Sequence, residues 1–119
     1  MTTLNQPIEP LEFLLSEGDG MISREQVTVT VAGGVAIPAG QVLGKITATS
    51  KYVIHNTGAG DGSQNAAAIL GYPLAGVNGD YRSLVFVRYC EVIGNRLNNS
   101  VAPITATVTA LTALGIIVR

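Results

Sequence analysis

The chain has 119 residues, the length of one compact domain. Its 7 lysines and arginines against 8 acidic residues give a net charge of −1, which excludes the clustered basic surface that binding to nucleic acid needs. Hydrophobic residues make up 47% and charged residues 13%, which excludes a disordered chain and favours a subunit interface, because a small domain cannot bury so much apolar surface alone.

The first 20 residues differ in charge from the rest of the chain. Four acidic residues and no lysine or arginine give them a charge of −4, whereas residues 21–119 carry +3. Pro7 and Pro10 each keep the preceding residue out of the helical region. We therefore predict an extended N-terminal arm over residues 1–11 and a single β-rich domain over residues 12–119. The arm is either a terminus without a role or a strap that becomes ordered on a partner by adding a strand to a sheet edge.

Strand patterns dominate the domain. Residues 26–31 alternate strictly, with Val27, Val29 and Val31 on one face and two threonines on the other, which predicts a half-buried strand. The longest apolar run, residues 83–93, has apolar residues on both sides, so we expect one strand that is covered on both faces. Shorter strands are predicted over residues 35–37, 42–49, 52–55 and 67–72.

The C-terminal part contains the one helical pattern. Residues 104–114 place Val108, Leu111 and Leu114 on one stripe, and Gly115 suits a left-handed residue after a helix. A closing strand is predicted over residues 116–118. Residues 97–118 carry no charge, which raises the question of a membrane span, but their four threonines and one proline favour a soluble domain.

These patterns together predict a mostly β fold, barrel-like or sandwich-like, with one short C-terminal helix and an extended N-terminal arm. Because of the alternation and the apolar runs, we expect ten residues in the protein interior: Val27, Val29, Leu43, Ile46, Ile69, Leu70, Leu84, Phe86, Cys90 and Leu111.

Candidate chemical sites are few. The glycine-rich loop 56–65 lacks the lysine of a phosphate-binding loop and precedes a strand pattern, so we expect a tight connection. Cys90 and His55 are each the single residue of their type, and Cys90 lies in an apolar strand where a thiol is usually inert. We therefore expect no catalytic residue, no metal site and no cofactor. A lysine that carries a prosthetic group needs an exposed hairpin tip, whereas Lys45 falls inside a predicted strand. Lys51 lacks the flanking residues of a carrier motif.

A series of short segments occurs in a characteristic order through residues 12–119. The segments are EFLLSE (12–17), SREQVTV (23–29), AGQVLGKIT (39–47), KY (51–52), DGS (61–63), AAIL (67–70), VR (87–88), EV (91–92) and LGIIVR (114–119). In this order and spacing, the chain resembles the head decoration proteins of tailed double-stranded DNA bacteriophages, the lambda-type family.

The resemblance implies a structural protein and not an enzyme. It would bind as a homotrimer to the outside of the expanded phage head, at three-fold and quasi-three-fold sites, and stabilise the head against the pressure of the packaged DNA. Its partners would be the major capsid protein and its own copies, with no direct contact to nucleic acid or to a membrane. It would be made in the host cytoplasm and be located on the outer surface of the virion.

The resemblance also implies that the N-terminal arm contacts the capsid protein. We expect these contacts at Thr3, Leu4, Gln6, Pro7, Ile8, Pro10, Leu11 and Glu12. The alternative is a small β-barrel carrier or a surface-binding module without catalytic activity.

Overall fold

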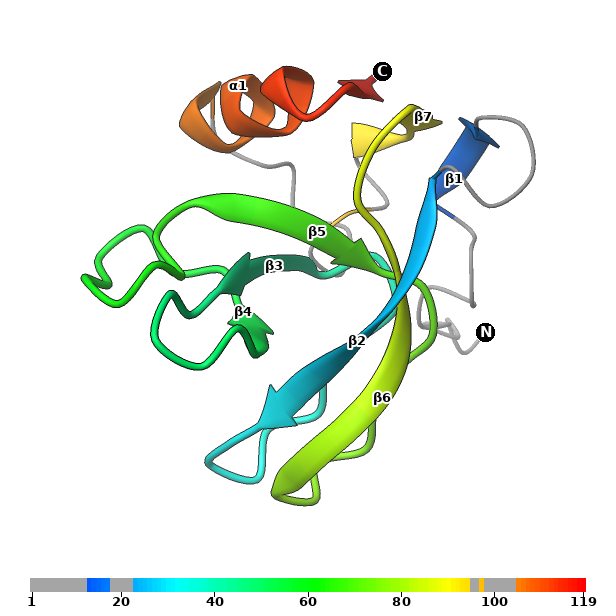
Figure 1. Cartoon of the computed structure of the whole chain (residues 1–119). Helices are drawn as coiled ribbons and strands as arrows, with labels where there is room; N and C mark the ends of the chain where they lie inside the picture. The colour runs from blue at the N-terminus through cyan, green and yellow to red at the C-terminus, as the bar shows by residue number, and fades with distance from the viewer. Residues whose placement is uncertain (1–12, 18–22, 95–96, 98–104) are drawn as a thin grey trace, which may run out of the picture.

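The fold is given by a computed structural model that describes residues 13–17, 23–94, 97 and 105–119 (Figure 1). The predicted arm, residues 1–11, lies outside the described residues, as does Glu12, the expected first residue of the domain. The elements in chain order are β1 (Leu14–Glu17), β2 (Arg24–Val31), β3 (Val42–Lys45), β4 (Tyr52–Ile54), β5 (Ala66–Leu70), β6 (Gly79–Phe86), β7 (Cys90–Val92), α1 (Thr105–Ala113) and β8 (Ile116–Val118). The mostly β fold class with one short C-terminal helix is confirmed.

Five of the strands close into a barrel in the order β2-β4-β3-β5-β6. β2 pairs antiparallel with β6 along its whole length, from Arg24 opposite Phe86 to Val31 opposite Gly79. On its other side β2 meets β4 through one parallel pair, Val29 with Tyr52. The barrel is therefore tightly joined along β2 and β6 and only narrowly joined between β2 and β4.

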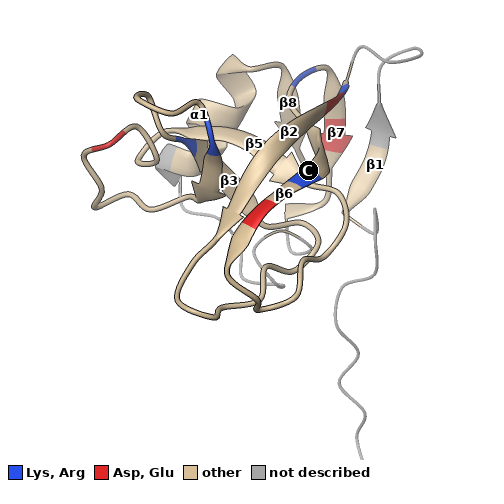
Figure 2. Cartoon of the chain, turned by 60° about the horizontal axis from the view of Figure 1, so that its bottom comes forward, with Lys and Arg blue, Asp and Glu red and all other residues tan. Residues whose placement is uncertain are grey.

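The predicted alternation of β2 is confirmed. Val27, Val29 and Val31 are buried inside the barrel, and the two threonines between them are half-buried on the outer face. The loops that follow β2 and precede β6 lie at the end of the barrel farthest from the helix (Figure 1). Figure 2 brings this end forward and shows few charged residues on it.

The three remaining strands form a small sheet beside the barrel, in the order β1-β7-β8. β7 lies in the middle, antiparallel to β1 and parallel to β8. α1 leads into β8 and lies over β5 (Figure 1). The small sheet and α1 cover one side of the barrel.

This arrangement creates two separate apolar cores. The barrel core lies inside the barrel: Val27, Val29, Val31, Ile37, Leu43, Tyr52, Ala68, Leu70, Val85 and Val87. The joint core lies between the barrel wall and the elements that cover it: Phe13, Val42, Ala66, Ile69, Phe86, Cys90, Val92, Leu97, Leu111 and Ile116. Strands that separate the two cores are therefore buried on both faces.

The prediction of one long strand over residues 83–93 is wrong. β6 ends at Phe86 and β7 begins at Cys90, because the chain leaves the barrel here and enters the small sheet. Tyr89 has a left-handed backbone with φ 52° and is exposed. The Ser23 hydroxyl donates to the Tyr89 carbonyl at 2.8 Å, which holds this bend. A run of apolar residues in the sequence does not indicate whether one strand continues or the chain passes from one sheet to another.

Smaller corrections concern the ends of the shorter strands. β3 stops at Lys45 because the chain turns over residues 47–50, where the Ser50 amide donates to the Ile46 carbonyl at 2.8 Å. The predicted strand over residues 35–37 is a single bridge between Ile37 and Leu74. The helix and the closing strand are confirmed, and Gly115 has the expected left-handed backbone with φ 86°.

Eight of the ten expected interior residues are buried, and Ile46 and Leu84 are half-buried. Leu84 pairs with the exposed Gln26, so its side chain belongs to the outer face of the barrel. Ile46 follows the last residue of β3, at the start of the turn. In the helical stripe, Leu111 is buried and Val108 half-buried, whereas Leu114 is exposed.

Candidate functional site

All eight residues predicted to contact the capsid, from Thr3 to Glu12, lie outside the described residues. The described chain begins at Phe13, which is completely buried in the joint core. Its ring packs edge-on against Phe86 with a centroid distance of 5.6 Å, and its carbonyl accepts a hydrogen bond from the Ile93 amide at 2.8 Å. The residues before Phe13 therefore start from a fixed point beside the small sheet.

His55 connects the glycine-rich loop to the helix. Its Nδ1 lies 3.0 Å from the Ser63 carbonyl, and its Nε2 lies 3.2 Å from the Thr107 Oγ1. Because a carbonyl only accepts, Nδ1 carries a proton, and in the neutral ring Nε2 then accepts from the Thr107 hydroxyl. The His55 ring therefore links a loop to α1, which is a structural role.

Cys90 is buried on β7 in the joint core.

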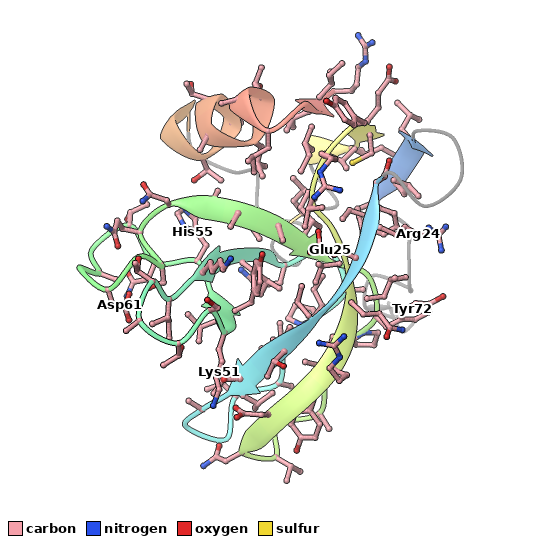
Figure 3. All side chains as sticks on the ribbon, in the orientation of Figure 1. Arg24, Glu25, Lys51, His55, Asp61 and Tyr72 are labelled. Carbon is pink, nitrogen blue, oxygen red and sulfur yellow. The ribbon has the colours of Figure 1, made fainter. Side chains whose placement is uncertain are left out.

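The glycine-rich loop 56–65 folds back on β3 and satisfies its polar groups locally. The Thr47 amide donates to the Asp61 carbonyl at 2.9 Å, and the Ser63 hydroxyl donates to the Asp61 carboxylate at 2.6 Å. Hydrogen bonds from Ser63 lower the pKa of Asp61 below its usual value. A side chain on Gly44 would collide with the Ser63 backbone. Figure 3 shows Asp61 and His55 on the same side of the barrel.

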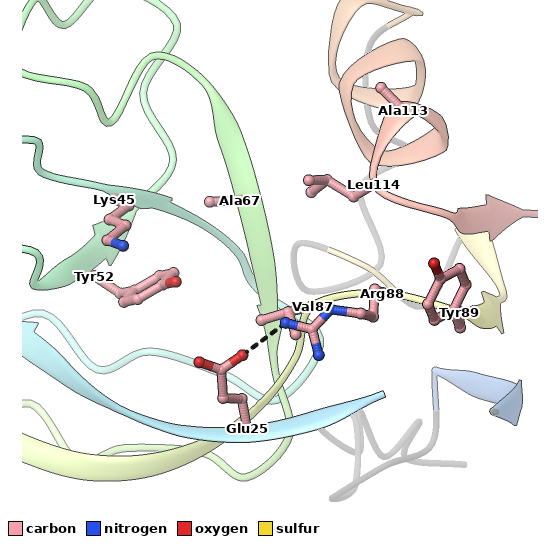
Figure 4. A pocket seen from close by; sticks show the side chains of 9 residues that line it. All are labelled: Glu25, Lys45, Tyr52, Ala67, Val87, Arg88, Tyr89, Ala113 and Leu114. Atoms are coloured by element: carbon pink, nitrogen blue, oxygen red, sulfur yellow. Dashed lines mark hydrogen bonds and ion pairs between the residues drawn. The ribbon is translucent and has the colours of Figure 1, made fainter. Parts of the chain in front are cut away.

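A groove of about 530 Å³ lies between β2, β5 and the end of α1 (Figure 4). The Arg88 Nη2 and the Glu25 Oε2 form an ion pair of 3.0 Å on the β2 side of the groove. The lining residues are Glu25, Lys45, Tyr52, Ala67, Val87, Arg88, Tyr89, Ala113 and Leu114.

Tyr52 lines this groove and is largely buried. Its burial, with the nearby Glu25 carboxylate adding and Arg88 opposing, raises the pKa of its hydroxyl above the usual 10.0, so the phenol is neutral at physiological pH. The Lys45 ammonium lies 5.9 Å from the centre of the Tyr52 ring. A second hollow of about 360 Å³ shares Glu25, Lys45 and Tyr52 with the first.

No pattern in the sequence predicted this groove. Glu25 and Arg88 are 63 residues apart and meet because β2 pairs with β6. No local spacing signals such a pair. Of the two lysines considered for a carrier, Lys45 lines the groove, and Lys51 forms an ion pair of 2.6 Å with Asp80.

Among the described residues, no group of three or more histidine, cysteine, aspartate or glutamate residues could hold a metal ion. In that same part of the chain, no helix has the length and apolar character to span a membrane.

A comparison with curated proteins finds no match. The family model described as bacteriophage lambda head decoration protein D matches residues 3–116, nearly the whole chain. The matched region contains both hollows, both cores and most of the predicted arm. The chain therefore belongs to the family of bacteriophage lambda head decoration protein D.

Proposed function

We propose that this protein binds as a homotrimer to the outside of the expanded phage head, at three-fold and quasi-three-fold sites, and stabilises the head against the pressure of the packaged DNA. The observation that carries the proposal is the family match over residues 3–116, which supports a role in decoration of the phage capsid. In this proposal the partners are the major capsid protein and further copies of the chain. The protein is made in the host cytoplasm and acts on the outer capsid surface.

Residues 1–11 act as a strap in this proposal, ahead of a single domain over residues 12–119. Their two prolines disfavour helix, and an extended segment can add a strand to the edge of a neighbouring sheet. Leu4 and Ile8 would fill shallow pockets, with Thr3, Gln6, Pro7, Pro10, Leu11 and Glu12 along the same contact. Three straps on one trimer bind multivalently, so individually weak contacts release slowly.

The buried Phe13 supports this role of the strap. A ring fixed in the joint core gives the preceding residues a defined starting point, so that less freedom is lost when the strap binds. Because Phe13 belongs to the joint core and lies outside residues 2–10, removal of these residues leaves Phe13 in the chain.

The test is deletion of residues 2–10, followed by thermal melting and co-sedimentation with purified heads. We expect the melting temperature and the oligomeric state to stay nearly unchanged and the binding to expanded heads to fall strongly. Unexpanded heads should bind little of either protein. Binding of the intact protein should also weaken as salt rises, because the residues up to 20 carry −4.

A variant with Thr2 and Asn5 replaced by alanine is the matched control, because both changes lie in the strap but outside the proposed contacts. It should bind expanded heads as the intact protein does. Full binding by the deletion variant would show that the strap is a terminus without a role. Failure of the intact protein to bind expanded heads would contradict the proposed function itself.

A further inference from the structure

Two loops of the barrel form an exposed surface without charge. Residues 32–40 and 71–79 contain no aspartate, glutamate, lysine, arginine or histidine, and Figure 2 shows the end of the barrel that carries their tips. Val35 is 53% exposed, and Val77 is 63% exposed. Tyr72, which is 46% exposed, extends the same surface along the side of the barrel (Figure 3). We call these two loops the uncharged surface.

The uncharged surface is held in one shape by hydrogen bonds between its loops. Ile37 and Leu74 exchange two backbone hydrogen bonds, of 3.0 and 2.8 Å. The Gly34 amide donates to the Asn78 side chain at 2.7 Å. A Cβ on Gly76 would come within 2.5 Å of the Gly34 carbonyl, so the two backbones are in close contact. A surface that is already ordered loses little conformational freedom on binding.

Charged residues border this surface on the barrel side. Asp80 directly follows the second loop and pairs with Lys51 at 2.6 Å, and it accepts a hydrogen bond from Thr30 at 2.7 Å. Arg82 lies exposed two residues further along β6. An apolar exposed patch with a polar rim is typical of an interface with another protein.

The exposed apolar residues at the other end of the molecule have different neighbours. Ile117 pairs in β8 with Glu91, and Glu91 forms an ion pair of 3.2 Å with Arg119. Tyr89 directly follows Arg88, which pairs with Glu25. Such a mixed surface suits a partner of different sequence that supplies complementary charges.

A symmetric contact has another requirement. Around a rotation axis the same residues of different copies come close together, so any charge near the axis faces a like charge and repels it. A preformed surface without charge avoids this repulsion. We therefore propose that the uncharged surface is the contact between copies of this chain, with Val35 and Val77 at its centre. The number of copies in the assembly and its position on the phage head rest on the proposed function above.

The test places a cysteine at Val77 and oxidises the protein with copper phenanthroline, both as concentrated free protein and on decorated heads. Val77→Cys should form disulfide-linked pairs of chains on a non-reducing gel. Ile117→Cys is the matched control, because Ile117 is an exposed aliphatic residue in the small sheet, and it should stay at the level of the unmodified protein, which retains only the buried Cys90.

A charge at the same position gives a second measurement. Val77→Asp should lower the occupancy of heads at least several-fold and shift the concentrated free protein toward monomer in sedimentation velocity. Ile117→Asp should change the sedimentation of the free protein little. Melting curves of both variants establish that they are folded.

The proposal is overturned if Val77→Cys gives no linked pairs in either setting, or if Val77→Asp leaves both occupancy and sedimentation unchanged. A disulfide from Val77→Cys to the capsid protein would assign the surface to the head and would also overturn it. Failure of the unmodified protein to bind heads contradicts only the proposed function, because cross-linking of the free protein still decides the contact.

Discussion

The barrel core and the joint core share the strands β3, β5 and β6. Neighbouring residues divide between them: Leu43, Leu70 and Val85 point into the barrel, while Val42, Ile69 and Phe86 point outward under the small sheet and α1. Where a strand separates the two cores, neighbouring residues are both apolar, whereas β2 alternates because only its inner face is fully buried. The hydrophobic pattern of a strand therefore reports how many of its faces are covered, and the first prediction below tests this division.

The largest effect is expected from Phe86→Ala, which empties the centre of the joint core. Phe86 is fully buried, packs on Phe13 and lies 5.2 Å below the Arg24 guanidinium. The free energy of unfolding should fall by about 3–5 kcal/mol in chemical denaturation. Hydrogen exchange should accelerate more in β7 and β8 than in β2.

Leu70→Ala is the matched variant in the barrel core, with an expected loss of about 2–5 kcal/mol. It should accelerate exchange in β2 as well as in β6, because Leu70 lies inside the barrel. Identical exchange patterns for the two variants would contradict the division into two cores.

Gly44→Ala should have the next largest effect, because the new methyl group meets the backbone of Ser63. We expect a loss of about 1–3 kcal/mol in unfolding free energy as the loop 56–65 is pushed off β3. Gly60→Ala in the same loop is the control, since a Cβ there has open space around it. Equal stability of the two variants would show that the loop does not need its close approach to β3.

Thr107→Val removes the hydroxyl that ties α1 to His55 at nearly constant volume. Thr107 is buried, and its hydroxyl is the hydrogen-bond partner of the His55 Nε2. The expected cost is about 1 kcal/mol by thermal or chemical denaturation. Thr112→Val is the control, because that exposed hydroxyl bonds to a carbonyl of its own helix. A larger loss for Thr112→Val would contradict a tether between helix and barrel.

The smallest effect is expected from Asp80→Asn on the barrel surface. Hydrogen bonds from Lys51 and Thr30 lower the pKa of Asp80 below its usual 3.8, so the unfolded chain binds the proton more readily than the folded chain. The stabilisation by the carboxylate is complete above the unfolded pKa and is lost as pH falls through the folded pKa. The melting temperatures of wild type and Asp80→Asn, measured between about pH 2 and 7, should therefore differ most near neutral pH and become equal in acid.

Lys51→Met removes the other half of the ion pair and should behave like Asp80→Asn near neutral pH. A difference between wild type and Asp80→Asn that does not change with pH would show that the carboxylate acts through packing and not through its charge.

Several local features of this protein can be predicted from short sequence patterns. The alternation in β2, the helix ended by Gly115 and eight of the ten interior residues follow from periodicity and from single-residue preferences. These features depend on residues that are close in the chain, so a short window contains the information.

Which segments of the chain meet depends on tertiary contacts. The bend at Tyr89 divides one continuous apolar run between two sheets. The Glu25–Arg88 ion pair joins segments that are far apart in the chain, and so does the uncharged surface. The apolar run predicts that Leu84 lies in the interior, although its pairing with Gln26 places it on the outer face of the barrel. The physical reason is that strand pairing and the packing of one element on another are contacts between residues far apart in the chain. Composition and periodicity indicate that a strand has an apolar face, but they do not indicate which segment packs against it.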